Sequence, residues 1–299
     1  MVRLRQSLNG IHGVMTANMS LNDQFLQTMS GHLFLTYEHE KRLNPVKPAK
    51  HSLDGKLIIS LTSYTPRFRF LHLTLGSLLE QTVLPDAIIL WIAESELSSL
   101  PEKVLALRRG ITILPCEDLR SYKKIIPALE QYPDAYIVNC DDDLYYPRDW
   151  LACLVDGAKE NKQSVIARSV HRFHYLPTGE LAPSIDWTFD VQDDRARKRS
   201  TDIIPIGSGG VLYPPGSMHK DVTDVELFKR LCPTSDDLWL YVMTRLNGYL
   251  PVKIGRRIIP IPWPGTQEIG LFRNNVLTND DAAIRELMAH YGSGIFGIT

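Results

Sequence analysis

The chain contains little cysteine, and its four cysteines are scattered, with no CxxC pair among them. A zinc site or a disulfide framework requires closely and regularly spaced cysteines, so this spacing argues against both. We therefore expect four reduced thiols of the kind that cytosolic proteins bury: Cys116, Cys140, Cys153 and Cys232.

The chain also lacks an excess of charge and a long apolar run. Its 33 Lys and Arg residues face 34 Asp and Glu residues, whereas proteins that bind nucleic acids usually carry a basic excess. No apolar run reaches the ~18 residues of a membrane-spanning helix, and no apolar signal segment follows Arg3 and Arg5. We expect a cytoplasmic protein without a nucleic-acid partner. Peripheral contact between residues 1–50 and the inner membrane stays open.

Three units are expected along the chain. Residues 1–50 form an N-terminal extension, with helical apolar spacing over Leu21–Leu35 and a proline-containing linker at Asn44–Pro48. Residues 51–275 form the main domain, and residues 276–299 hold a C-terminal helix.

The main domain begins with apolar strands that alternate with helical segments. This alternation predicts an α/β fold with a doubly wound, mostly parallel sheet. The expected strands are 57–62, 87–92, 111–114 and 135–139, and the expected helices are 67–81, 101–109 and 122–131. Ligands bind beyond the carboxyl ends of such strands, so Asp141–Asp143 should lie at the binding edge.

The second half is less regular, and we expect an α+β half there. Its predicted elements are a helix at 147–160, a strand at 164–167, a helix at 235–247 capped by Ser235, and a helix at 280–291 capped by Asn279. The charged run Asp193–Arg199 is most simply a solvated loop.

Three adjacent carboxylates, Asp141, Asp142 and Asp143, follow the strand at 135–139. Adjacent carboxylates repel one another, and a bound cation relieves that repulsion. Mn²⁺ and Mg²⁺ take oxygen ligands and leave room for phosphate oxygens, so the triplet predicts a metal site. The alternative is an acidic turn that caps the next helix.

Two further motifs accompany the triplet. Asp236 and Asp237 open the helix at 235–247, where they suit either the positive end of the helix dipole or a general base. The glycine-rich run Gly207–Gly210 permits close backbone approach but lacks the Lys-Ser/Thr of a P-loop. It is either a turn between strands or a wall of the ligand pocket.

The order of these motifs between Leu57 and Gly248 resembles the GT-A class of glycosyltransferases. The spacing from Glu117 to Lys124, followed by a helix and the triplet, is similar to family-2-like bacterial capsule and lipopolysaccharide transferases. More distantly it is similar to β-1,3-galactosyltransferases.

The resemblance implies a role for each matched residue. Asp141 and Asp143 match the DxD motif that binds the metal and the donor, and the acidic pair supplies the base, with Asp237 favoured over Asp236. The remaining residues expected to contact the donor or to wall its pocket are Thr62, Tyr64, Arg67, Lys124, Asp142, Gly209, Gly210 and Arg273. For Lys124, a solvated helix face is the alternative.

The sequence therefore predicts a metal-dependent transferase that moves a sugar from a nucleotide-sugar, with a UDP-sugar favoured, to a carbohydrate or glycolipid acceptor. The resemblance implies inversion at the sugar and a role in surface polysaccharide or lipopolysaccharide synthesis. One alternative is a nucleotidyltransferase acting on sugar phosphates, although Thr62–Arg67 lacks the glycine-rich loop expected there. Another is a non-catalytic carbohydrate-binding protein.

Overall fold

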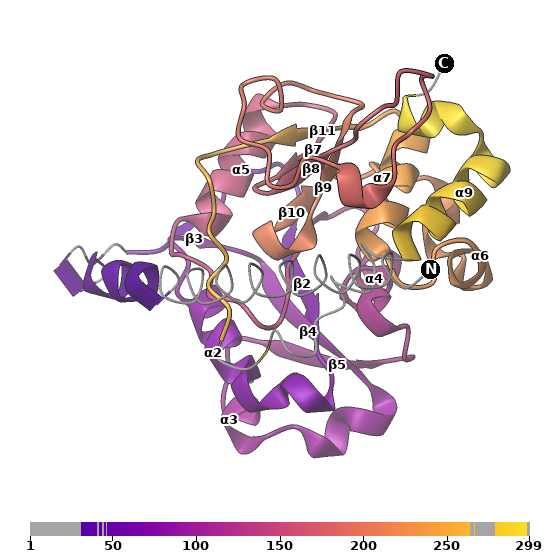
Figure 1. Ribbon diagram of the computed structural model, residues 1–299. Helices are drawn as coiled ribbons and strands as arrows, with labels where there is room; N and C mark the ends of the chain where they lie inside the picture. The colour runs from indigo at the N-terminus through magenta and orange to yellow at the C-terminus, as the bar shows by residue number, and fades with distance from the viewer. Residues whose placement is uncertain are drawn as a thin grey trace, which may run out of the picture.

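A seven-stranded sheet organises the computed structural model, which describes residues 31–40, 42–43, 45, 47–263, 266 and 279–297 (Figure 1). The strand order is β11-β7-β10-β6-β2-β4-β5, and β10 alone runs antiparallel to its two neighbours. The strands are β2 (Leu57–Thr62), β4 (Ala87–Ala93), β5 (Thr112–Cys116), β6 (Tyr136–Asn139), β7 (Ser164–Ala167), β10 (Val211–Tyr213) and β11 (Leu250–Lys253). The predicted mostly parallel α/β sheet is confirmed.

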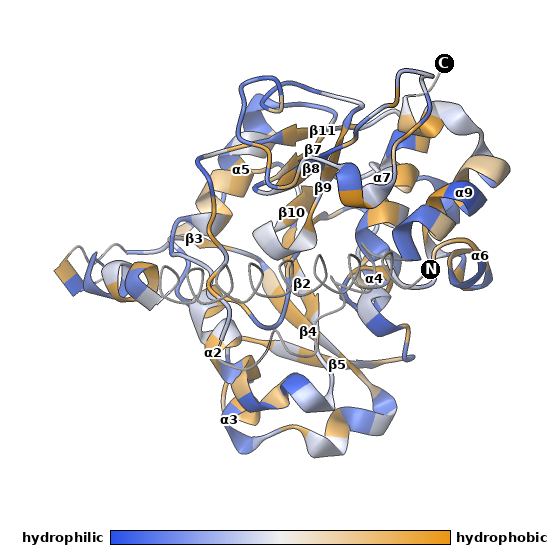
Figure 2. Cartoon of the chain, viewed as in Figure 1, coloured by the Kyte–Doolittle hydropathy of each residue, from blue (hydrophilic) through white to orange (hydrophobic). Residues whose placement is uncertain are grey.

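Successive residues of the central strands point to opposite faces of the sheet, and both faces are covered. In β2, Leu57, Ile59 and Leu61 join one buried cluster, while Ile58 joins the other. The first cluster includes α2 (Phe68–Leu79), α3 (Glu102–Leu105) and α5 (Trp150–Glu160); the second includes α4 (Ile126–Gln131), α6 (Val225–Leu231), α7 (Asp236–Leu246) and α9 (Asp280–Tyr291). Figure 2 shows the strands between these layers as largely hydrophobic segments.

Several helix ends differ from the predicted ones. The segment expected at 122–131 divides into a 3₁₀ turn, Arg120–Lys124, and α4, because Pro127 has no amide hydrogen and fits only the first turn of a helix. The expected capping by Ser235 and Asn279 is wrong, since neither side chain makes a capping hydrogen bond. Helices α7 and α9 therefore begin without a capping side chain from Ser235 or Asn279.

The two ends of the described chain pack onto the main domain. Residues 31–40 are helical, and the ring of Phe34 lies 5.2 Å from that of Tyr145. The part of the predicted Leu21–Leu35 helix before residue 31 lies outside the described residues. β1 (Ala49–Lys50) pairs in parallel with β3 (Val83–Leu84), and α9 buries Leu287 in a core shared with α7. These contacts tie both expected outer units to the central domain.

The irregular half contains a small antiparallel pair, β8 (Val170–Arg172) and β9 (Ile203–Pro205), which leads into the glycine-rich turn and β10. This arrangement agrees with the expected α+β half and carries one wall of the cavity described below. In the part of the chain that the structure describes, no helix has the length and apolarity needed to cross a membrane.

Gly210 and Gly179 provide a matched test of packing behind the glycine-rich turn. Both have positive φ, 88° and 86°, but a Cβ on Gly210 would lie 2.5 Å from the buried Trp150 ring, whereas one on Gly179 meets nothing within 4 Å. We expect Gly179→Ala to lose about 1–2 kcal/mol of unfolding free energy from backbone strain. Gly210→Ala should lose about 1–3 kcal/mol more from overpacking. Urea denaturation measures both, and equal losses would contradict this packing.

Candidate active site

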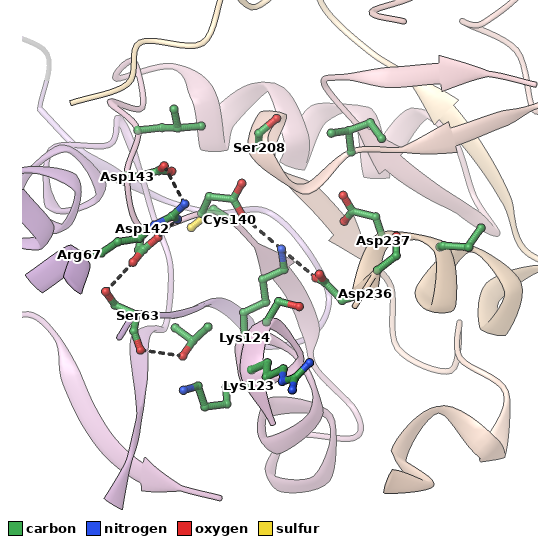
Figure 3. A pocket seen from close by; sticks show the side chains of 18 of the residues that line it. Ser63, Arg67, Lys123, Lys124, Cys140, Asp142, Asp143, Ser208, Asp236 and Asp237 are labelled. Atoms are coloured by element: carbon green, nitrogen blue, oxygen red, sulfur yellow. Dashed lines mark hydrogen bonds and ion pairs between the residues drawn. The ribbon is translucent and has the colours of Figure 1, made fainter. Parts of the chain in front are cut away.

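A cavity of about 570 Å³ lies at the carboxyl edge of the sheet. The ends of β2 and β6 and the 3₁₀ turn Arg120–Lys124 form one side, and the start of α7 with the β8–β9 region forms the other. Figure 3 shows side chains from both sides converging on it. The predicted binding edge and the cavity therefore coincide.

Asp142 holds Arg67 in place beside the cavity. One of its carboxylate oxygens accepts a bond from Arg67 Nη1 at 2.7 Å, and the other accepts a short bond from the Ser63 hydroxyl. Burial raises the pKa of Asp142 against the opposing effects of both partners. Asp142 lines the cavity, and its two carboxylate oxygens hold Arg67 and Ser63, so these contacts position Arg67; the expected contact of Asp142 with the donor stays a prediction.

Lys124 joins the two sides of the cavity. Its ammonium lies 3.1 Å from Asp141 Oδ1 and 2.8 Å from Asp236 Oδ2, and the residue is only 6% exposed (Figure 3). Burial favours the neutral amine, but the negative charges of Asp141 and Asp236 prevail and raise the Lys124 pKa well above its usual value. The alternative of a solvated helix face is therefore wrong, and the ammonium meets protein carboxylates.

The position of Lys124 is fixed by the strands beneath it. Its backbone carbonyl accepts a 2.7 Å bond from the Ser60 hydroxyl in β2, and that hydroxyl accepts a 2.9 Å bond from Trp91 Nε1 in β4. Ser60 is fully buried. The sheet thus aims the lysine at the acidic residues.

Asp143, the last residue of the triplet, has a pKa well above the usual value for an aspartate. Burial, opposed by Arg67 and reinforced by the charges of Asp141 and Asp142, raises its pKa to about 7. Arg67 Nη2 lies 3.4 Å from Asp143 Oδ2, and Arg67 also binds Asp142. One guanidinium and one ammonium therefore offset part of the charge of the three carboxylates, so repulsion within the triplet does not by itself require a metal.

Asp237 faces the triplet from the start of α7 and differs from its neighbour Asp236. Its carboxylate oxygens lie 3.2 and 3.0 Å from the backbone nitrogen of Gly207, whose N–H donates to them, whereas Asp236 is ion-paired with Lys124. Burial raises the Asp237 pKa to about 7, with Lys124 opposing the shift and Asp236 adding to it. A carboxylate with such a pKa suits proton removal near neutral pH.

Gly207 is the glycine on which the site depends, rather than the two predicted ones. A Cβ at Gly207 would lie 3.0 Å from both Asp237 Oδ1 and Lys124 Nζ. Gly209 instead abuts Ser169, and Gly210 abuts Trp150. The structure thus corrects the placing of Gly209 and Gly210 in the pocket wall; they allow the turn to pack on the core behind it.

The remaining predicted residues flank the triplet. Thr62, the last residue of β2, and Tyr64 line the cavity, and the Thr62 hydroxyl donates to the Trp91 carbonyl at 2.8 Å. Lys123, also on the lining, pairs with Asp118 at 2.8 Å, a contact that sequence reasoning did not identify. Arg273 lies outside the described residues.

The acidic triplet offers two carboxylates to a divalent cation. Asp142 is committed to Arg67 and Ser63, which leaves Asp141 and Asp143 as the predicted ligands. Among the described residues, no three His, Cys, Asp or Glu side chains are grouped as a metal site. Two carboxylates nevertheless fit Mg²⁺ or Mn²⁺ when phosphate oxygens and water complete the shell.

Gly207 belongs to the predicted glycine-rich run, but the sequence did not single it out over Gly209 and Gly210. The cavity-lining residues Phe189, Ile204 and Ile206 were not identified, because they read as ordinary core positions. His171 accepts a 3.2 Å bond from the Asp190 backbone N–H and lines the cavity, while His174 is exposed.

No protein-family model matches the chain, and no curated protein matches it in sequence. Among solved structures, it is similar to the mannosyltransferase PcManGT from Pyrobaculum calidifontis in complex with GDP-Man and Mn²⁺ (TM-score 0.46, 14% identity, 88% of this chain and 76% of that chain). It is also similar to a 4-diphosphocytidyl-2C-methyl-D-erythritol synthase (0.44, 13%, 75% and 99%). A third is glucosyl-3-phosphoglycerate synthase from Mycobacterium tuberculosis with phosphoglyceric acid (0.42, 13%, 83% and 89%). These TM-scores and identities are too low to bear on the reaction.

The raised pKa of Asp143 predicts how the metal-free protein responds to pH. The pKa of Asp143 is about 7 in the folded protein, above the value of about 4 in an unfolded chain. The contribution of protonated Asp143 to the free energy of unfolding is therefore fully present below about pH 4 and is lost as the pH rises through about 7. The difference in unfolding free energy between Asp143→Asn and the wild type should therefore shift in favour of the variant by about 1–3 kcal/mol from pH 5 to pH 8.

Urea denaturation in EDTA at the two pH values measures this difference. Asp194→Asn is the matched control, since the Asp194 side chain is 99% exposed and should show no such pH-dependent gain. If Asp143→Asn is destabilised relative to the wild type more at pH 8 than at pH 5, the raised pKa of Asp143 is contradicted.

Proposed function

We propose that the protein is a glycosyltransferase that moves a sugar from a nucleotide-sugar, favouring a UDP-sugar, to a hydroxyl of a carbohydrate or glycolipid acceptor. One observation carries the proposal: a single cavity holds two separate acidic groups, with Asp141–Asp143 at the strand ends and Asp237 at the start of α7. Group transfer to a hydroxyl needs both a charged site for the leaving group and an uncommitted base. The motif order further supports a role in surface polysaccharide or lipopolysaccharide synthesis.

The strand-end side of the cavity suits the nucleotide diphosphate. Arg67, Arg120 and Lys123 supply positive charge there, and Thr62, at the end of β2, and Tyr64 line the same side. Asp141 and Asp143 would hold a divalent cation, which would offset the charge that builds on the leaving diphosphate. Arg67, fixed by Asp142, contributes positive charge beside the phosphate oxygens.

Asp237 acts as the general base on the opposite side. It takes the proton from the acceptor hydroxyl as the hydroxyl oxygen forms a bond to the anomeric carbon, and the bond to the diphosphate breaks with its electron pair on oxygen. Gly207 holds the carboxylate in position through its N–H. Such a single displacement inverts the anomeric centre.

The Asp237 side also distinguishes this function from nucleotidyl transfer. A sugar phosphate attacks as an anion, so it needs a cationic site for its phosphate and no base. Among the described residues that line the cavity near Asp236 and Asp237, the basic side chain is Lys124, and it is already paired with two carboxylates. An acceptor hydroxyl fits this environment better than an acceptor phosphate does.

Donor binding tests the metal role. Calorimetry with UDP and Mn²⁺ should show binding to the wild type that EDTA abolishes, and Asp143→Asn should lose this metal-dependent binding. Asp194→Asn is again the control, because Asp194 lies outside the cavity lining. Unchanged UDP affinity in Asp143→Asn would contradict a role for Asp143 in metal binding.

The base is tested by Asp237→Asn, which should lower sugar transfer by about 10²–10⁴ while UDP binding is retained. Glu226→Gln is the matched control: Glu226 is an exposed acid in the first turn of α6, so it shares the helix-dipole effect but not the cavity. Equal turnover per folded molecule in both variants would remove Asp237 as base. NMR of the product should show inversion, and retention would rule out the single displacement.

A further inference from the structure

One end of the cavity, next to Asp237, has a largely apolar wall. We call this the apolar end, and its lining residues are His171, Trp187, Phe189, Ile204, Ile206 and Leu238. They come from β8, from β9 and the residue after it, from the loop between these strands, and from α7. None of them has a part in the mechanism proposed above.

Contacts of the β8–β9 region hold four of these residues in place. His171 and Ile204 are directly paired across the β8–β9 ladder, and the Phe189 ring lies 4.7 Å from the His171 ring. Trp187 packs against the core through Phe173, with 4.8 Å between ring centroids. The wall is therefore built by the fold of the β8–β9 region and is not a chance gathering of exposed side chains.

The apolar end begins at the proposed base. Ile206 immediately precedes Gly207, whose N–H donates to Asp237, and Leu238 immediately follows Asp237. A hydroxyl placed at Asp237 would therefore carry its neighbouring atoms into this apolar surface.

The titratable groups at this end are His171 and Asp280. Burial lowers the pKa of His171 to about 4, so the imidazole is neutral at physiological pH. Burial also raises the pKa of Asp280. The remaining polar groups in the lining there are those of Ser184 and Ser235. Arg67, Arg120 and Lys123, in contrast, lie with the strand-end side.

We propose that the apolar end binds an alkyl or aryl group of the acceptor, carried next to the hydroxyl that is glycosylated. A plain oligosaccharide would leave many hydroxyls unpaired against this wall, at a loss of binding free energy. Phe189, 37% exposed, extends the apolar surface outward from the cavity. The acceptor is thus an amphipathic glycoside. The assignment of this end to the acceptor rests on the proposed function.

The test is a titration of the full-length protein with methyl, butyl and hexyl β-D-glucoside, below their micelle concentrations, by calorimetry. Each methylene that enters the apolar end should raise affinity about fourfold, so hexyl glucoside should bind at least about tenfold more tightly than methyl glucoside. Equal affinities across the series, or no binding of the hexyl compound, would overturn the proposal.

Variants assign the effect to this surface. Phe189→Ser should weaken hexyl glucoside binding at least about fivefold, and Phe189→Leu should retain most of it. Leu176→Ser is the control, because Leu176 is similarly exposed, at 39%, but does not line the cavity. An equal loss in Leu176→Ser and Phe189→Ser would overturn the proposal.

UDP binding with Mn²⁺, measured on the same samples, reports that each variant is folded and tests the nucleotide side separately. Absence of UDP binding in the wild type would count against the proposed function. A chain-length dependence that Phe189→Ser removes would still support an apolar ligand site.

Discussion

The buried ammonium of Lys124 is the interaction on which the site depends. It lies between Asp141, at the end of β6, and Asp236, at the start of α7, so it connects the parallel half of the sheet to the irregular half. Removal of either carboxylate would leave a buried charge partly unpaired, which typically costs several kcal/mol. Asp236 pairs with Lys124, whereas its neighbour Asp237 accepts the N–H of Gly207.

The three carboxylates of the acidic triplet have different partners. Asp142 turns inward to Arg67 and Ser63, while Asp141 pairs with Lys124 and remains partly exposed at the cavity. Asp143 is left with a pKa raised to about 7 by burial. Because burial and the charges of Asp141 and Asp142 disfavour its ionised form, Asp143 makes the stability of the fold depend on pH.

Backbone geometry is as important here as charge. Gly207 brings its N–H to Asp237 and leaves room for Lys124, since a Cβ would lie 3.0 Å from both side chains. The adjacent Gly210, with φ of 88°, lets the turn pass over Trp150. One short turn therefore positions Asp237, the proposed base, on one side and packs against the core on the other.

The sequence by itself determined the sheet and the acidic edge. The apolar run Leu57–Thr62 became β2 with the predicted bounds, and the triplet follows β6, because a buried strand needs apolar side chains on both faces. Only the tertiary structure decided which of the charged residues meet. Lys124 and Asp236 are 112 positions apart, and no local pattern encodes their 2.8 Å contact. The same holds for Gly207, Phe189 and the antiparallel placing of β10: each depends on long-range packing, in which the partner of a residue is set by the register of the sheet and not by its neighbours in sequence.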